Sequence, residues 1–135
     1  MTVVLDASVL LKWFVQEPGS DAALDVKTRY LDGELAIVVP DLALYEIPNV
    51  LRFKRGVPES AVHAAMQALW ELDLEIVSPS EMLLEDSIHC SFTTDLSLYD
   101  CVYLALAKEL DATLITADRQ LSHAASRFVR TTTLR

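Results

Sequence analysis

The sequence predicts an α/β domain built on a mainly parallel sheet of four to five strands. Short apolar runs alternate with segments of helical periodicity along the chain, and the runs are continuously apolar, as in strands that are buried on both faces. Strands separated by helices pair in parallel through right-handed crossovers. The 135 residues show no repeat or linker, so we expect residues 1–135 to form a single domain.

The first half of the chain contains two predicted strands. Residues 3–5 form the first, which Asp6 closes, and residues 9–15 look helical. A second helix occupies the segment between Pro18 and Gly33, where Ser20 can cap it and Gly33 can end it. Residues 35–39 form the second strand, which Pro40-Asp41 stops before a helix that runs to about residue 56.

The second half repeats this alternation. A helix from Pro58 to about residue 72 leads to a strand over 74–77, and Ser80-Glu81 opens a further helix that frays near residue 93. The helix that Ser97 opens is apolar almost all round, which places it at the centre of the fold. A strand over 112–116, a short helix from Asp118 and an edge strand after Phe128 complete the domain.

Composition narrows the class of protein. No apolar run approaches the roughly 18 residues of a membrane span, and Asp6 interrupts the only N-terminal signal-peptide candidate, so we expect a cytoplasmic protein with no membrane span. Cys90 and Cys101 lack the spacing of a zinc site, which favours reduced, buried thiols.

The net charge of −9 argues against a broad electrostatic grip on nucleic acid, although two basic clusters allow a local one. These clusters are Arg52, Lys54 and Arg55, and Arg127, Arg130 and Arg135. For the first cluster, the negative end of a helix dipole is an equally good explanation.

Two carboxylates follow predicted strands. Asp6 closes the first strand, and Asp118 follows the strand that ends at Thr116. Because the carboxyl ends of parallel strands face one crevice, both residues lie where α/β proteins place ligand sites. Each also has a simpler explanation as the cap of the following helix.

Two more carboxylates lie on helices that can reach this crevice. Asp100 is in the first turn of the central helix, where Ser97-x-x-Asp100 also reads as a capping box. Glu46 shares a mostly apolar helical stripe, and burying an unpaired carboxylate costs several kcal/mol. Glu46 therefore needs a cation, a proton or a partner such as Lys12.

The four carboxylates form an oxygen-only ligand set of the kind that suits Mg²⁺ or Mn²⁺. Ser8 and Thr116 would then be hydroxyls that orient carboxylates or water. Paired ions of this type activate water and stabilise the leaving oxygen in phosphodiester cleavage. The sequence therefore predicts a metal site made by Asp6, Glu46, Asp100 and Asp118.

Four spaced motifs, in this order, resemble the PIN-domain family and in particular the VapC-type toxins of prokaryotic toxin–antitoxin modules. They are Val3-Val4-Leu5-Asp6-Ala7-Ser8, Glu46-x-x-Asn49-x-Leu51, Tyr99-Asp100-x-x-Tyr103-x-x-Leu106-Ala107 and Thr116-Ala117-Asp118-x-x-Leu121. Lys12-Trp13-Phe14 also resembles a common continuation of the first motif. The motifs cover essentially the whole chain.

This resemblance implies a three-layer α/β/α fold and Mg²⁺- or Mn²⁺-dependent endoribonuclease activity. It also implies a homodimer and an antitoxin that blocks the site. The four carboxylates match the family's acidic quartet by position, with Ser8, Asn49 and Thr116 in support. Lys12, Arg52 and Arg55 are the candidates for contacts with the RNA substrate.

Three local features leave alternatives open. Pro48 predicts that the helix carrying Glu46 either begins late or bends. Asp95 is an extra acid whose expected role is local capping. The segment 61–74, with Met66, Leu69, Trp70 and Leu72, has more apolar surface than one core face needs, so it either packs in the core or binds a second subunit or an antitoxin helix.

Two other functions compete with the nuclease. A non-catalytic PIN-like domain that binds RNA or protein has no need of four convergent carboxylates. A receiver or phosphatase would use Asp6 as a phosphoryl acceptor, but Asp6-Ala7-Ser8 lacks the second Asp of a DxD motif. We therefore expect a metal-dependent endoribonuclease.

Overall fold

Five strands form a central sheet in the order β3-β2-β1-β4-β5. In the computed structural model, which describes residues 1–135, all four strand pairings are parallel, and Val4 on the central strand pairs with Val38 and Leu114. The strands are β1 (Thr2–Leu5), β2 (Ala36–Pro40), β3 (Glu75–Val77), β4 (Thr113–Thr116) and β5 (Thr131–Thr133). The expected mainly parallel sheet of four to five strands is confirmed.

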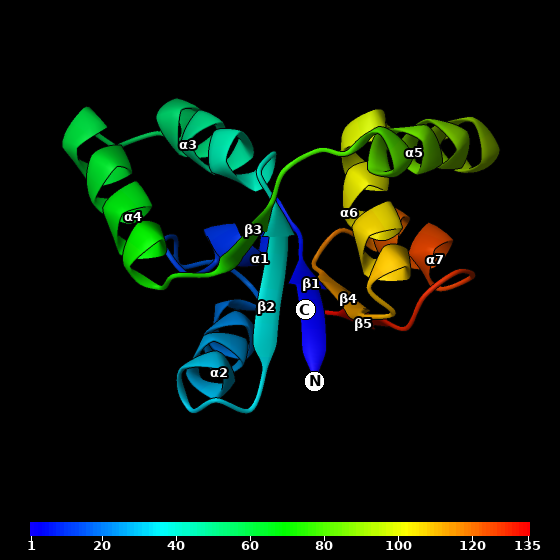
Figure 1. Ribbon diagram of the computed structural model, residues 1–135. Helices are drawn as coiled ribbons and strands as arrows, with labels where there is room; N and C mark the ends of the chain where they lie inside the picture. The colour runs from blue at the N-terminus through cyan, green and yellow to red at the C-terminus, as the bar shows by residue number, and fades with distance from the viewer.

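Seven helices cover the two faces of this sheet. They are α1 (Ala7–Leu11), α2 (Ser20–Leu31), α3 (Ala43–Phe53), α4 (Glu59–Glu71), α5 (Glu81–Thr94), α6 (Leu98–Glu109) and α7 (Arg119–Ala125). Figure 1 shows α1 to α4 on one side of the sheet and α5 to α7 on the other, which confirms the three-layer α/β/α architecture. None of these helices has the length and apolar character needed to cross a membrane.

The strand order places a switch point between β1 and β4. From β1 the chain moves outward through β2 to β3, and α5 and α6 then carry it back to β4 on the opposite side of β1. The helices that follow β1 and β4 therefore leave on opposite faces, and a crevice opens between the carboxyl ends of the two strands. Asp6 and Asp118 follow these two strands directly.

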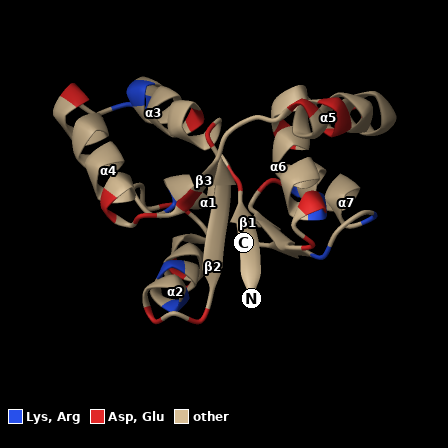
Figure 2. Cartoon of the chain, viewed as in Figure 1, with Lys and Arg blue, Asp and Glu red and all other residues tan.

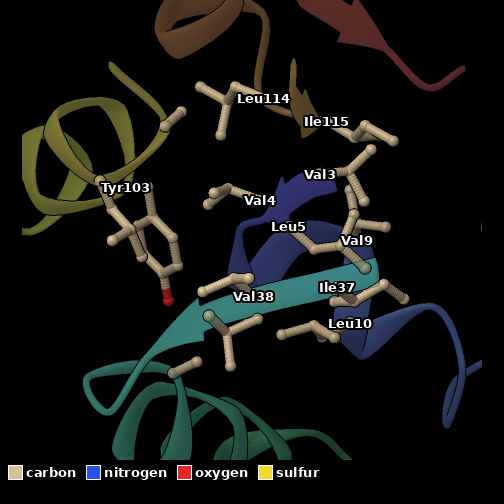
Figure 3. Packing of buried hydrophobic residues seen from close by; sticks show 14 of the residues in the cluster. Val3, Val4, Leu5, Val9, Leu10, Ile37, Val38, Tyr103, Leu114 and Ile115 are labelled. Atoms are coloured by element: carbon tan, nitrogen blue, oxygen red, sulfur yellow. The ribbon is translucent and has the colours of Figure 1, made fainter. Parts of the chain in front are cut away.

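The core fills both faces of the sheet, and its centre is made by β1 and α6. Val3, Val4 and Leu5 have no exposed surface, and the stretch 103–107 of α6 is buried as well. In Figure 3 the ring of Tyr103 extends from α6 toward β2 and packs over the apolar side chains of the sheet. The prediction that the Asp100 helix lies at the centre of the fold is confirmed, because an element that is apolar all round must be covered on all sides.

Some boundaries differ from the expected ones. α1 begins at Ala7 because Asp6 caps it, accepting from Val9 N at 3.3 Å. α3 begins at Ala43 and continues through Pro48, so a late start of that helix is wrong. Proline removes one backbone donor, and the hydrogen bonds on either side, such as Glu46 N to Leu42 O at 3.0 Å, hold the helix together.

Both cysteines are free thiols, with Cys101 buried and Cys90 half-buried.

Candidate active site

Asp6 sits at the carboxyl end of β1 and is almost completely buried, with 5% of its surface exposed. Its Oδ1 accepts hydrogen bonds from Ser8 Oγ (2.5 Å) and Val9 N, and its Oδ2 accepts from Thr116 Oγ1 (2.5 Å). Burial raises the pKa of Asp6 to about 6, with a further contribution from the charge of Asp100, although the three hydrogen bonds oppose the rise. Asp6 is thus both a helix cap and a carboxylate of unusual pKa.

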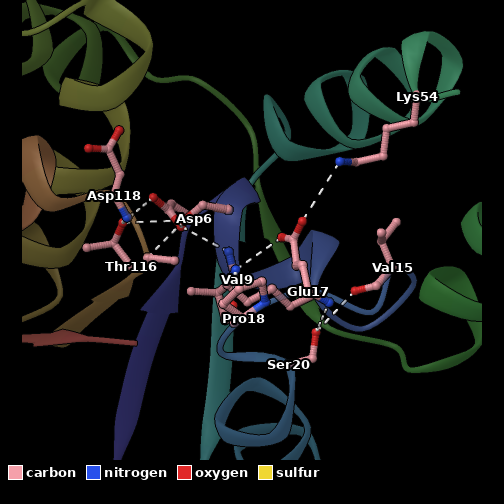
Figure 4. A network of polar contacts seen from close by, with 12 residues as sticks. Asp6, Val9, Val15, Glu17, Pro18, Ser20, Lys54, Thr116 and Asp118 are labelled. Atoms are coloured by element: carbon pink, nitrogen blue, oxygen red, sulfur yellow. Dashed lines mark hydrogen bonds and ion pairs between the residues drawn. The ribbon is translucent and has the colours of Figure 1, made fainter. Parts of the chain in front are cut away.

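Two hydroxyls join Asp6 to the connection between β4 and α7. Ser8 Oγ accepts from Ala117 N at 2.9 Å, and Thr116 Oγ1 accepts from Asp118 N at 3.0 Å. Each hydroxyl therefore donates to Asp6 and accepts from the backbone beside Asp118, as Figure 4 shows for Thr116. The two hydroxyls fix the two strand ends relative to each other.

Asp118 caps α7. Its Oδ1 accepts from Gln120 N (2.9 Å) and Leu121 N (3.2 Å), which satisfies two free N–H groups of the first turn. In Figure 4 its carboxylate extends away from Asp6. The capping explanation is confirmed for Asp118 as it is for Asp6, and in both cases the cap leaves the residue at the carboxyl edge of the sheet.

Glu46 is held by Tyr103, not by a basic residue. Tyr103 OH donates to Glu46 Oε1 at 2.6 Å, across the sheet edge from α6 to α3. The alternative that Lys12 pairs with Glu46 is wrong, because Lys12 Nζ donates to Glu17 Oε1 (3.1 Å) and to Pro18 O (2.8 Å). Burial and the Glu46 carboxylate raise the pKa of Tyr103 far above its usual value, so the phenol stays a donor.

Sequence reasoning did not assign a role to Tyr103, although a signal was present. Tyr103 lies one turn after Asp100 on a helix that is predicted to be buried, and a buried phenol requires a hydrogen-bond partner. The side chain is only 2% exposed.

Asp100 is half-buried at the start of α6. Its backbone N–H donates to Ser97 Oγ at 3.1 Å, which is the Ser97 half of the expected capping box. Burial raises the pKa of Asp100, and the negative charges of Asp118 and Glu46 raise it further, while the Ser97 hydroxyl lowers it. The side chain therefore lies within the electrostatic field of the other carboxylates.

These four carboxylates have no basic partner, since every ion pair of the protein involves other acids. Acidic residues gather at the end of the central strands, between α3 and α6 (Figure 2). No three Asp, Glu, His or Cys side chains are placed to hold one ion. The oxygen-only donors and their unneutralised charge fit Mg²⁺ or Mn²⁺.

The remaining predicted residues lie around this centre in different settings. Asn49, Arg52 and Arg55 are exposed on α3 or just after it, and the Arg52 guanidinium lies 4.9 Å from the centre of the Phe53 ring. The Lys12 side chain is only 10% exposed and pairs with Glu17, which also pairs with Lys54 (Figure 4 shows Lys54 and Glu17). Lys12 therefore anchors the loop between α1 and α2. Asp95 is exposed and ends α5 in a left-handed conformation.

Replacing Tyr103 by Phe tests the role of the phenol. Glu46 Oε1 loses its donor while the ring keeps its packing, so we expect the free energy of unfolding to fall by about 1 kcal/mol. For the nuclease that the sequence predicts, we expect cleavage of RNA to fall by about tenfold, because Glu46 is no longer held in place. Thermal melting and cleavage rates are compared with those of Tyr99→Phe, an exposed residue on the same helix. Equal rates in the two variants would contradict a positioning role.

Comparisons with known proteins agree with this geometry. Residues 3–126 match the sequence model of the PIN domain family. The chain is 32% identical over 127 residues to Ribonuclease VapC3 of Pyrobaculum aerophilum. This match covers 90% of the chain and 93% of the relative.

Solved structures show the same fold. VapBC2 from Rickettsia felis, bound to a DNA fragment from its promoter, is similar with a TM-score of 0.76 and 13% identity over 100% of both chains. A toxin–antitoxin complex from Klebsiella pneumoniae is similar with a TM-score of 0.65 and 18% identity over 86% of both chains. These identities support the shared fold alone, whereas the family match spans nearly the whole sequence. The chain belongs to the PIN domain family.

Proposed function

We propose that this protein is a Mg²⁺- or Mn²⁺-dependent endoribonuclease and the toxin of a toxin–antitoxin pair. The observation that carries the proposal is the set of four carboxylates around the switch point, none of which has a basic partner. Folded proteins rarely keep several acids together without a compensating cation. The relative named as a ribonuclease, with 32% identity, supports RNA as the substrate.

In this proposal Asp6, Asp100 and Asp118 hold the metal, and Glu46 ligates through water or orients the attacking water. A bound divalent ion supplies a water of lowered pKa and stabilises the leaving oxygen. Ser8 and Thr116 keep Asp6 in place through their 2.5 Å hydrogen bonds, and Tyr103 does the same for Glu46. Asn49 and Arg52 are exposed on the helix that carries Glu46, Arg55 is exposed just after it, and all three are available to RNA, whereas Lys12 is engaged with Glu17.

The test is cleavage of total cellular RNA by the purified protein. We expect cleavage with Mg²⁺ or Mn²⁺ and none with excess EDTA, and we expect activity to return when the metal is added back. Mapping the cleaved ends identifies the preferred RNA. Cleavage that persists in EDTA would contradict the metal assignment. RNA that stays intact under all conditions would favour a non-catalytic domain.

An antitoxin partner is proposed for the surface between α3 and α4. The segment 61–74 proves to be divided: Leu69 is in the core, while Trp70 is 64% exposed. Trp70, Met66 and Tyr45 line a hollow whose rim carries Asp41 and Glu71. An amphipathic segment of an antitoxin would cover these apolar groups. The presence of this fold in a toxin–antitoxin complex supports the assignment.

The homodimer is a separate proposal. Leu84, Ile88 and Phe92 follow one another at four-residue spacing on α5, and Phe92 is 89% exposed. A second copy of the chain that packs on this stripe would remove it from water. Sedimentation or light scattering of the purified protein gives the mass of the assembly.

A further inference from the structure

A polar groove lies between α7 and β5, next to the carboxylates but distinct from them. One wall is the helical face formed by Arg119, Ser122, His123 and Ser126, at spacings of three and four residues. The other wall is the strand face formed by Thr131, Thr133 and Arg135, at alternate positions. The groove has a volume of about 460 Å³, and no apolar side chain lines it.

The charge of this groove is opposite to that of the protein. The chain carries a net charge of −9, yet no Asp or Glu lines the groove. Neither Arg119 nor Arg135 takes part in an ion pair, whereas Lys12, Arg29, Lys54 and Arg130 all do. Two guanidiniums that form no ion pair, with no Asp or Glu side chain lining the groove, create a local site for anions in an acidic molecule; Arg135 also borders a second hollow that contains Glu17 and Asp21.

Hydroxyl groups line the groove between the arginines and its far end. Ser122 Oγ and Thr133 Oγ1 share one hydrogen bond, which uses one of their two protons and leaves the other for a ligand. Ser126 Oγ donates to His123 O at 2.8 Å, and Thr131 Oγ1 donates to Val129 O at 3.1 Å, so these two hydroxyls can accept from a ribose 2′-OH but have no proton left for a phosphate. Arginine and small hydroxyl side chains are typical contacts of a sugar–phosphate backbone.

The topology brings the arginines to the end of the groove nearest the carboxylates. α7 begins directly after Asp118, and β5 runs parallel to β4, so it ends at the same edge of the sheet. The ladder continues past β5, with Leu134 N donating to Thr116 O at 2.8 Å, which keeps Arg135 at this edge. The helical wall spans seven residues and is about 10 Å long, so it lies along the groove from the arginine end.

We infer that this α7–β5 groove binds the sugar–phosphate backbone of the RNA substrate beside the scissile phosphate, with Arg119 and Arg135 contacting phosphates. The inference rests on the proposed nuclease function. A nucleic-acid backbone fits better than an acidic peptide, because a peptide that docks in a groove needs apolar pockets for anchoring side chains and this groove offers none.

The experiment measures binding of a fluorescent single-stranded RNA to protein carrying Asp100→Asn, which prevents cleavage. Adding Arg119→Ala and Arg135→Ala together is expected to raise the Kd about tenfold or more at low salt. It is also expected to reduce the slope of log K against log salt by about 1.4, since each lost phosphate contact removes about 0.7. The same pair of changes in the active protein is expected to lower cleavage at subsaturating RNA.

The matched control is Lys27→Ala with Arg29→Ala on α2, which removes the same charge far from α7 (Figure 1). We expect this control to bind RNA within about twofold of its parent. Unchanged binding and salt slope in the groove variant, while the wild type still cleaves RNA, would overturn the groove assignment and leave the nuclease standing. The groove assignment also fails if the variant loses binding of an acidic peptide but keeps its binding of RNA. If the wild type neither binds nor cleaves RNA, both proposals fail.

Discussion

Replacing Asp100 by Asn is expected to lower RNA cleavage by about 10³-fold without unfolding the protein. The negative charges of Asp118 and Glu46 both raise the pKa of Asp100. Asp100 therefore lies close to both of these carboxylates. Losing one ligand to a divalent ion removes several kcal/mol of transition-state stabilisation, and about 4 kcal/mol corresponds to this loss in rate. The amide keeps the size of the side chain and the bond from its backbone N–H to Ser97 Oγ.

Removal of this charge also relieves repulsion, so we expect the melting temperature of the Asp100→Asn variant to be unchanged or slightly higher. The measurement is the initial rate of RNA cleavage at saturating Mg²⁺, together with thermal melting. Asp95→Asn is the matched control, because it makes the same change five residues earlier at an exposed position. A rate within tenfold of wild type would remove Asp100 from the metal site.

The variant Asp6→Asn is expected to abolish cleavage and yet to stabilise the metal-free protein at neutral pH. The pKa of Asp6 is about 6 in the folded state, against 3.8 for the unperturbed group, because burial disfavours the charged form. The protonated carboxyl therefore favours folding. Its contribution is complete below about pH 3.8 and is lost as the pH rises through about 6.

At pH 7.5 the ionised Asp6 lowers the free energy of unfolding by about 3 kcal/mol relative to its protonated form. Asparagine avoids this cost but cannot accept from both Ser8 and Thr116 as the carboxylate does, so we expect a net gain of about 1–3 kcal/mol. Thermal melting in EDTA should show a melting temperature about 5 °C higher at pH 7.5, with the difference disappearing near pH 4.

The opposite outcome, a variant that melts lower than wild type at pH 7.5, would mean that the hydrogen bonds of Asp6 outweigh its desolvation. Such a result would place the residue in a structural role. The expected combination of lost activity and gained stability is typical of a site that keeps charges together for function. It is also distinct from the effect of a cap mutation, which only destabilises.

Much of the fold and the candidate site could be predicted because the rules that govern them are local. The apolar run 3–5 predicts a buried strand wherever it lies in the sheet, and Asp6 after it predicts a cap or a ligand at the carboxyl edge. The same rule applies to Asp118. Both residues prove to be caps, and a cap does not conflict with the proposed ligand role because both functions need the same edge.

Contacts between distant segments could not be predicted in the same way. Lys12 was one possible partner of Glu46, but Lys12 binds Glu17 within its own loop. Glu46 instead pairs with Tyr103, 57 residues away. No local pattern ranks these partners, because the choice depends on which side of the sheet each helix crosses.

The sequence by itself determined the alternation of strands and helices, the central position of α6 and the presence of four carboxylates at element ends, since burial pattern and capping chemistry are encoded in neighbouring residues. Only the tertiary structure decided that β1 lies beside β4. That adjacency brings Ser8 and Thr116 onto one carboxylate and aligns α7 with β5 to form a basic groove in an acidic protein. The physical reason is that strand order depends on how whole layers of helices and strands pack together, and no single segment of the sequence encodes that packing.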